Sequence, residues 1–207
     1  MGGKTKPMKR LLTSRGAATR RRIIEAAAEL IYAKGAERVS LDAVMEASGA
    51  SKSQVYHYFD SKDDLVHEVI EFQAARILQT NALHLDQLDS FEALYAWRDM
   101  TIAANRAGRG FGGCPLGLLA SELTAQSEDA RHRLDQSFAA WSAVIEAGLS
   151  RMKELGRIKP SAETKAIAVA VLAAIQGGIL LSKTARDSRP LELAFDMALS
   201  YIERHAI

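Results

Sequence analysis

The chain has 207 residues, a formal net charge of +2 and one cysteine, Cys114. Apolar residues make up 48% of it and charged residues 25%, which are ordinary proportions for a soluble globular protein. The single cysteine excludes an internal disulfide, and the histidines show no paired metal-ligand spacing, so we expect neither a metal nor another cofactor.

Charge is unevenly distributed along the chain. Residues 1–62 contain 12 Lys/Arg and 6 Asp/Glu, a net of +6, whereas residues 63–207 contain 15 and 19, a net of −4. This asymmetry predicts a polyanion-binding end attached to a body with another role, although basic tails can also be simply solvated. The basic start MGGKTKPMKR lacks the apolar core of a signal peptide, so we expect a cytoplasmic protein.

Two helices are predicted at the start of the chain. From Thr19 apolar residues recur at three- and four-residue steps, and Gly35 is suited to follow the end of that helix. Ser40 is the expected N-cap of a short second helix, which Gly49 ends after about two turns.

A third helix follows after a tight turn. Ser51 is its expected N-cap, and Gln54 three positions later completes a capping box. A scaffold helix, a short helix, a glycine turn and a further helix together predict a helix-turn-helix, in which the last helix enters the major groove of DNA.

The N-terminal residues of such a recognition helix should be polar, because they contact base edges. Gln54 can hold adenine through two hydrogen bonds, Lys52 can donate to guanine, and Ser51 and Ser53 can contact either base. Phosphate contacts are expected from Tyr56, Tyr58 and Lys62.

The remaining sequence is also predicted to be helical, so the fold class is all-α. A loop is expected at 106–113, where glycines are frequent. The expected helices cover residues 61–80, 90–107, 115–126, 127–156, 160–184 and 190–204.

The segment 166–181 is apolar on every face apart from Gln176, Gly177 and Gly178. It is shorter than the roughly 20 residues that a bilayer requires, so we predict no membrane span. A helix that is apolar all round is buried on all sides, and in a small body a second copy of the chain would cover one side. We therefore predict a homodimer through helices at 160–184 and 190–205, with the two glycines permitting close approach.

Motifs within residues 19–70 resemble the DNA-binding domain of the TetR family of transcriptional regulators. They are I-x-x-A in the first helix, G-A-x-x-V-S-L, and S-x-x-Y-x-Y-F-x-S-K-x-x-L across the third and fourth helices. The resemblance implies an all-α fold with a basic arm at 1–18, a DNA-binding domain at 19–62 and a ligand-binding, dimerising body at 63–207. It implies DNA contacts at Ser40, Ser51, Lys52, Ser53, Gln54, Tyr56, Tyr58 and Lys62.

The resemblance further implies a repressor that binds double-stranded operator DNA and is released from it by a small-molecule effector. Arg98 lies on an apolar stripe, where its charge requires a partner: Glu122, Glu146 or an anionic ligand. For each aromatic candidate of the ligand pocket, core packing is the alternative that we favour. The aromatic and polar candidates together are Tyr95, Trp97, Arg98, Phe111, Phe138, Trp141 and Gln176.

The segment GGCPLGLLASEL, residues 112–123, resembles a glycine–cysteine motif from a branch of this family whose repressors respond to electrophiles or oxidants. Cys114 precedes a helix N-terminus, which should lower its pKa. A thiol-sensing repressor is therefore an alternative function. A small buried hydrophobic residue is the alternative role for Cys114, and the one that we favour.

Two further function classes fit the sequence less well. No Ser/His/Asp order, phosphate loop or carboxylate pair indicates an enzyme. A nucleoid-binding protein would not need a large apolar, non-basic body. The effector, the operator and the choice between repression and activation stay open at this point.

Overall fold

The computed structural model describes residues 13–107 and 113–207, which form nine α-helices and, within that part of the chain, no strand beyond an isolated bridge. The all-α prediction is confirmed. The described chain divides into two compact units, the first ending at Val69 and the second covering Ile70–Ile207. Most of the predicted arm, residues 1–12, and the predicted pocket residue Phe111 lie outside the described residues.

The first unit begins with α1, Ser14–Lys34. Its N-cap is Thr13, whose hydroxyl accepts from the Gly16 N–H at 3.2 Å. The predicted start at Thr19 is wrong, and residues 14–18 of the expected arm are helical. A first turn requires a cap rather than an apolar face, so the apolar repeat marks where the helix becomes buried and not where it begins.

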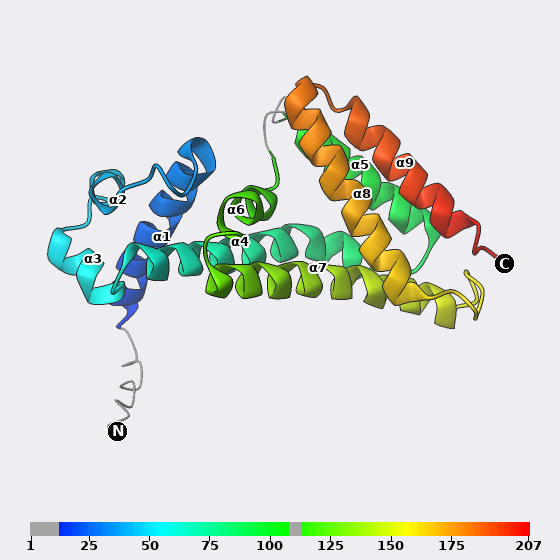
Figure 1. Cartoon of the computed structure of the whole chain (residues 1–207). Coiled ribbons are helices and arrows are strands. Elements are labelled where there is room, and N and C mark those ends of the chain that lie inside the picture. The colour runs from blue at the N-terminus through cyan, green and yellow to red at the C-terminus, as the bar shows by residue number, and fades with distance from the viewer. Residues whose placement is uncertain (1–12, 108–112) are drawn as a thin grey trace. The chain divides into compact units, whose positions relative to one another are not determined.

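The two short helices of this unit are α2, Leu41–Ser48, and α3, Lys52–Tyr58. Ser40 caps α2 as predicted, and Gly49 after it adopts φ +63° in the left-handed region. Glycine enters that region without a steric penalty, so the turn between α2 and α3 is built at this residue. Figure 1 shows α1 to α3 in blue and cyan.

A small apolar core holds the first unit together. Its members come from α1 to α3, their connections and the first turns of α4, and each is at most 6% exposed. Burial of this kind provides most of the stability of short helices, which are marginal in isolation. The core residues are Ile23, Ile24, Ala27, Ala28, Ile31, Ala36, Val39, Val44, Ala50, Val55, Phe59, Leu65, Val66 and Val69.

The helix α4, Lys62–Leu85, belongs to both units, because its first residues lie in the first unit and its remainder in the second. The predicted Ser61 start is confirmed, since the Ser61 hydroxyl accepts from the Asp64 N–H at 3.0 Å. The other helices of the second unit are α5 (Phe91–Ala107), α6 (Pro115–Leu123), α7 (Glu128–Glu154), α8 (Thr164–Ala185) and α9 (Arg189–Glu203).

The predicted start of α8 at Pro160 is wrong. Pro160 lies in a turn in which the Ala162 N–H donates to the Lys159 carbonyl at 2.9 Å. The Lys159 N–H in turn donates to the His205 carbonyl at 2.7 Å, so this segment is tied to the C-terminal end. The helix can begin only after these contacts, at Thr164.

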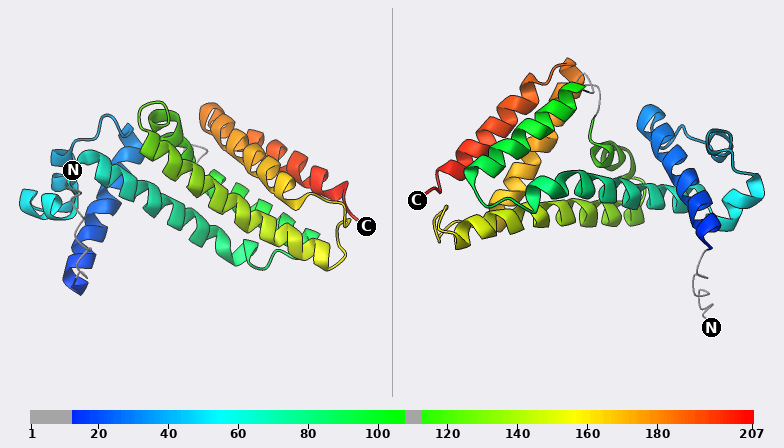
Figure 2. Two further views of the ribbon diagram at one scale, coloured as in Figure 1. Left: turned by 60° about the horizontal axis from the view of Figure 1, so that its bottom comes forward. Right: turned by 180° about the vertical axis from the view of Figure 1, so that it is seen from behind.

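The helices α8 and α9 lie side by side, as the views in Figures 1 and 2 agree. A Cβ on Gly178 would meet the Leu191 Cα at 2.9 Å, whereas a Cβ on Gly177 would meet nothing within 4 Å. Gly178 therefore permits close packing within the chain, rather than between chains as we expected.

The 22-residue α8 is longer than the apolar segment 166–181 from which we argued against a membrane span. By length and composition alone it could cross a membrane, but core helices of soluble proteins meet the same two criteria. Its buried side, which includes Ile167, Val171 and Ile175, packs inside the second unit. That packing accounts for part of its apolar character, because 33% of its apolar window is buried.

Candidate functional site

The start of α3 presents a polar, exposed surface. Ser51, Lys52, Ser53 and Gln54 are all exposed, whereas Val55 is fully buried. The predicted capping box is present: the Ser51 Oγ accepts from the Gln54 N–H at 3.3 Å, and the Gln54 Oε1 accepts from the Ser51 N–H at 2.9 Å. The four residues predicted to read bases are thus held together at one helix end.

The capping box affects what Gln54 can offer to a base. Its side-chain oxygen already accepts from Ser51, and its amide NH₂ is the group left to donate. That donor suits acceptors on a purine edge in the major groove. Holding adenine through two hydrogen bonds would require the Gln54 oxygen to accept a second one.

The other predicted DNA contacts occupy different environments. Tyr56 is 49% exposed and lies beside Lys52, whose Nζ is 6.0 Å from the ring centroid. Tyr58 is half-buried against the edges of its neighbours, and Ser40 is exposed at the N-cap of α2. Lys62 donates from its Nζ to the Glu37 carbonyl at 2.9 Å, so part of its function is structural.

Two arginines of α1 hold the first unit together, a role that sequence reasoning missed. The Arg22 Nε donates to the Ser48 carbonyl at 2.8 Å. The Arg20 guanidinium pairs with Glu68 at 2.5 Å and lies 5.5 Å from the Phe59 ring centroid. Part of the positive charge counted in residues 1–62 is therefore already used within this unit.

A cavity of about 230 Å³ lies in the second unit. It brings together three of the predicted pocket residues, Trp97, Cys114 and Trp141, from different elements. The helices α4, α5, α6, α7, α8 and α9 contribute to its wall. The remaining lining residues are Ile77, Asn81, Thr101, Ala104, Asn105, Gly113, Pro115, Ile175, Ile179 and Leu191.

A second cavity, of about 310 Å³, shares Gly113, Cys114 and Ile179 with the first. The predicted pocket residue Gln176 lines this second cavity, together with the exposed Lys183. Cys114 therefore lies in a wall common to both cavities. The other lining residues are Gly117, Leu118, Ser121, Gly177 and Leu180.

The polar groups of the first cavity differ in how they are satisfied. The Trp97 Nε1 donates to the Asn81 Oδ1 at 2.9 Å, and the Asn81 amide donates to the Ile77 carbonyl at 2.8 Å. By contrast, the buried Trp141 Nε1 and Asn105 Oδ1 have no hydrogen-bond partner among the described residues.

Burial raises the pKa of Cys114, which is only 9% exposed. Hydrogen bonds with the backbone of Gly117 and Leu116 and with the Gln176 side chain act in the opposite direction, but they are smaller. The expectation that the helix N-terminus lowers this pKa is therefore wrong, because desolvation of the thiolate outweighs the helix end. The environment agrees with the buried, hydrophobic role.

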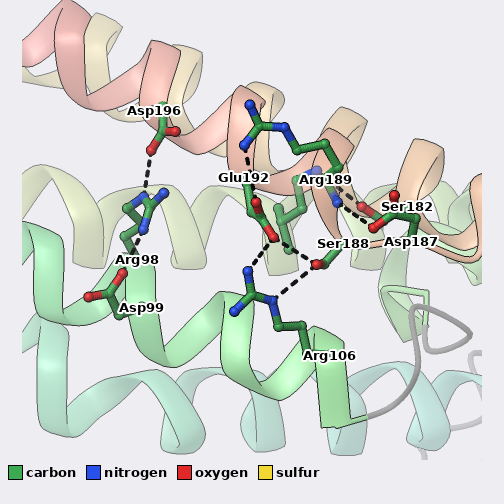
Figure 3. Close-up of polar contacts among 10 residues, drawn as sticks. Arg98, Asp99, Arg106, Ser182, Asp187, Ser188, Arg189, Glu192 and Asp196 are labelled. Carbon is green, nitrogen blue, oxygen red and sulfur yellow. Dashed lines mark hydrogen bonds and ion pairs between the residues drawn. The ribbon is translucent and has the colours of Figure 1, made fainter.

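Arg98 and Tyr95 do not join either cavity. The Arg98 Nε donates to Asp196 at 2.6 Å and its Nη1 to Asp99 at 2.6 Å (Figure 3). The protein partners predicted from the sequence, Glu122 and Glu146, are wrong, since Arg98 pairs with the two aspartates instead. Tyr95 is 44% exposed and donates to Glu203 at 2.5 Å.

Phe138 also lines neither of the two cavities; it is half-buried on α7. The described residues contain no group of three or more His, Cys, Asp or Glu that could hold a metal ion. The predicted pocket residues are thus divided between two cavities, the α5–α9 contact and the α7 surface.

A second ionic cluster connects α5 to α9, and sequence reasoning missed it (Figure 3). The Glu192 carboxylate accepts from the Ser188 hydroxyl at 2.8 Å, pairs with Arg106 at 2.7 Å and pairs with Arg189 at 3.3 Å. These contacts, led by the one from Ser188, lower the pKa of Glu192 to about 2. They fix the end of α5 that precedes the cavity residues Gly113 and Cys114.

The helices α8 and α9 carry large apolar side chains that the second unit leaves exposed. Their exposed fractions range from 41% to 64%, although each has the apolar character of a core residue. Exposed apolar groups on neighbouring helices are a candidate interaction surface. They are Val169, Leu180, Leu181, Leu193, Met197 and Tyr201.

Comparisons with known proteins agree with this architecture. Residues 23–69 match the family model for bacterial regulatory proteins of the tetR family. Residues 90–197 match that for the C-terminal domain of LmrA/YxaF-like transcriptional regulators. The two matches fall on the two units separately.

Curated relatives cover nearly the whole chain. It is 32% identical over 189 residues to an HTH-type transcriptional regulator in the lacX 3′ region of Lactococcus lactis subsp. lactis, covering 90% of this chain and 94% of that protein. It is 30% identical over 175 residues to the HTH-type transcriptional regulator LmrA of Bacillus subtilis, covering 84% and 90%.

Solved structures share the fold. A TetR-family regulator from Cytophaga hutchinsonii superposes with a TM-score of 0.81 at 18% identity, covering 95% of this chain and 98% of that one. The reduced form of E. coli NemR superposes with a TM-score of 0.77 at 21% identity, covering 92% and 98%.

Proposed function

The chain belongs to the TetR family of transcriptional regulators, and from this membership we propose that it is a repressor, released from operator DNA by a small molecule. We assign DNA binding to residues 19–62 and ligand binding and dimerisation to residues 63–207, and the basic residues of 1–18, the last of which belongs to α1, add charge. The observation that carries the proposal is the continuity of α4. Its first residues belong to the unit that contains α3, and its residues Ile77 and Asn81 line the cavity.

DNA recognition is assigned to the exposed start of α3. Gln54 and Lys52 read base edges, with Ser51 and Ser53 beside them, because their polar groups are exposed at the helix end that enters the major groove. Contacts with the phosphates, which position the protein, are assigned to Ser40, Tyr56, Tyr58 and Lys62.

A homodimer is supported by the exposed apolar residues of α8 and α9. A second copy would remove these side chains from water, and burial of apolar surface drives association. A two-fold dimer presents two recognition helices to half-sites about one DNA turn apart or slightly more, so the operator should be a near-palindrome.

Release requires a ligand that binds the DNA-free conformation more tightly than the DNA-bound one. A ligand in the cavity contacts α4, and a displacement of α4 can alter the separation of the two recognition helices. A 100-fold loss of operator affinity corresponds to roughly 2.7 kcal/mol of coupling, which is within the usual range. Because its proposed target is operator DNA, we propose that the protein acts in the cytoplasm.

The thiol-sensing alternative is less well supported, because burial raises the pKa of Cys114 and reactive cysteines are generally thiolates. Noncovalent binding is therefore the mechanism that we adopt. Replacing Cys114 by serine separates the two: an unchanged response supports noncovalent release, and loss of response to electrophiles supports thiol chemistry.

Selection of bound duplexes from a random-sequence library tests the proposed function. The full-length protein should enrich a near-palindrome with two half-sites. A nucleoid-type protein would enrich no defined sequence, and that outcome would contradict the assignment. Footprinting on a promoter region that contains the selected sequence then locates the operator.

A further inference from the structure

The lining of the first cavity restricts the charge of any molecule inside it. Among its described lining residues Cys114 is the only ionisable side chain, and the pKa of Cys114 is raised. The nearby α5 residue Arg98 is already paired with Asp196 and Asp99. Lys183 lies against the shared residue Gly113 but lines only the adjoining second cavity. A buried ion without a counter-charge is strongly disfavoured, so the first cavity suits an uncharged group.

Two polar atoms in this wall remain unsatisfied. Trp141 is 6% exposed, and its buried Nε1 donor has no partner among the described residues. The same holds for the Oδ1 acceptor of Asn105. The Trp97 Nε1 in the same cavity, by contrast, donates to the Asn81 side chain. Buried polar groups normally have hydrogen-bond partners, so Trp141 Nε1 and Asn105 Oδ1 are the atoms of this wall that can bond to a ligand.

We propose that the effector is an uncharged, largely apolar molecule that carries a hydrogen-bond acceptor for Trp141 Nε1 and a donor for Asn105 Oδ1. This inference rests on the proposed function, because it identifies the ligand class of the releasing site. Both atoms are covered by neighbouring atoms, so they meet the ligand only after side chains of the wall shift. The two hydrogen bonds then form only when the ligand is bound.

Four probes with one ring system test the ligand class by equilibrium dialysis against the full-length protein at neutral pH. They are naphthalene, 2-naphthol, 2-methoxynaphthalene and 2-naphthoate. Two fused rings suit a cavity of about 230 Å³, since an apolar cavity of roughly 150 Å³ binds benzene. We expect 2-naphthol to bind about tenfold more tightly than naphthalene, with the methyl ether between them and the carboxylate weakest.

Trp141→Phe and Trp97→Phe form a matched pair of variants. Trp141→Phe removes the unpartnered donor but leaves the Asn105 acceptor, so the preference for 2-naphthol over naphthalene should fall from about tenfold to about threefold. Trp97→Phe removes a donor that is already used, so the preference should persist. Loss of the Trp97 Nε1 donor also leaves the Asn81 Oδ1 unpaired, so thermal unfolding should occur at a lower temperature in Trp97→Phe than in Trp141→Phe.

Several results would overturn the ligand class: equal binding of all four probes, tightest binding of 2-naphthoate, no binding of 2-naphthol up to its solubility limit, or an unchanged preference in Trp141→Phe. A separate gel-shift measurement addresses release. If 2-naphthol binds as expected but leaves DNA affinity unchanged, the release mechanism fails and the ligand class stands. If charged molecules release the DNA and bind Trp141→Phe as tightly as the wild type, the ligand class fails and the release mechanism stands.

Discussion

Gly178 of α8 lies directly against the backbone of Leu191 at the start of α9, so that a Cβ at Gly178 would be 2.9 Å from the Leu191 Cα. Real Cβ atoms essentially never approach this closely, and backbone cannot move aside as a flexible side chain can. The adjacent Gly177 has open space around it. The contact between α8 and α9 therefore requires a glycine at position 178 but not at position 177.

Gly178→Ala should destabilise the protein by about 1–3 kcal/mol, because the added methyl group forces α8 and α9 apart. Gly177→Ala should leave the stability unchanged or raise it by up to about 1 kcal/mol, because alanine favours the helix. Chemical denaturation of the two variants measures both effects. A similar loss in both would show that the α8–α9 contact is not the cause.

Leu181→Glu should dissociate the proposed dimer, because it places a charge on the exposed apolar surface of α8. Leu155→Glu is a matched control, since Leu155 follows α7 and is 58% exposed compared with 59% for Leu181. Sedimentation at micromolar concentration should show a dimer for the wild type and Leu155→Glu and a monomer for Leu181→Glu. A monomeric wild type would contradict the proposed interface.

Gln54→Ala and Lys62→Ala should weaken DNA binding in different ways. Gln54→Ala should relax the preference at one operator position, with a discrimination loss of about 1–3 kcal/mol. Lys62→Ala should weaken all sequences alike and reduce the salt slope by about one. It should also lower stability slightly, because the Lys62 Nζ bonds to the Glu37 carbonyl. Titrations over operator variants and salt concentrations measure these effects, and uniform losses in both variants would reject the roles.

Glu192 should make stability depend on pH in the acid range. Its folded pKa is lowered from 4.5 to about 2, so its contribution is fully present above pH 4.5. As pH falls from 4.5 towards 2 the unfolded state binds the proton first, and that contribution is lost. Denaturation curves should show Glu192→Gln with a shallower decline over this interval. Parallel declines in the wild type and the variant would count against the cluster.

Sequence reasoning succeeded where the determinant is local. The caps at Ser40 and Ser51 and the turn at Gly49 depend on residues within a few positions, so they could be identified before the fold was seen. Arg98 shows the opposite case, because its partner Asp196 is 98 residues away and no local pattern points to it. Pro160 misled because a contact with the C-terminal end delays the start of α8.

The candidate site shows the same division. The polar start of α3 was evident from the sequence, and its exposure is confirmed. Trp97 and Trp141 were chosen as pocket candidates by residue type and helical position, but only the tertiary fold brings the α5 and α7 residues into one cavity. Burial, which depends on the tertiary fold, raises the pKa of Cys114 despite the nearby helix N-terminus.

The central claim is that a ligand in the body and operator DNA oppose each other. The most direct measurement is operator affinity with and without a molecule that tryptophan fluorescence shows to bind the body, paired with the affinity of that molecule with and without operator. Linkage requires the same factor in both directions, and we expect about 100-fold. A molecule that binds the body and leaves operator affinity unaltered would contradict release through that site.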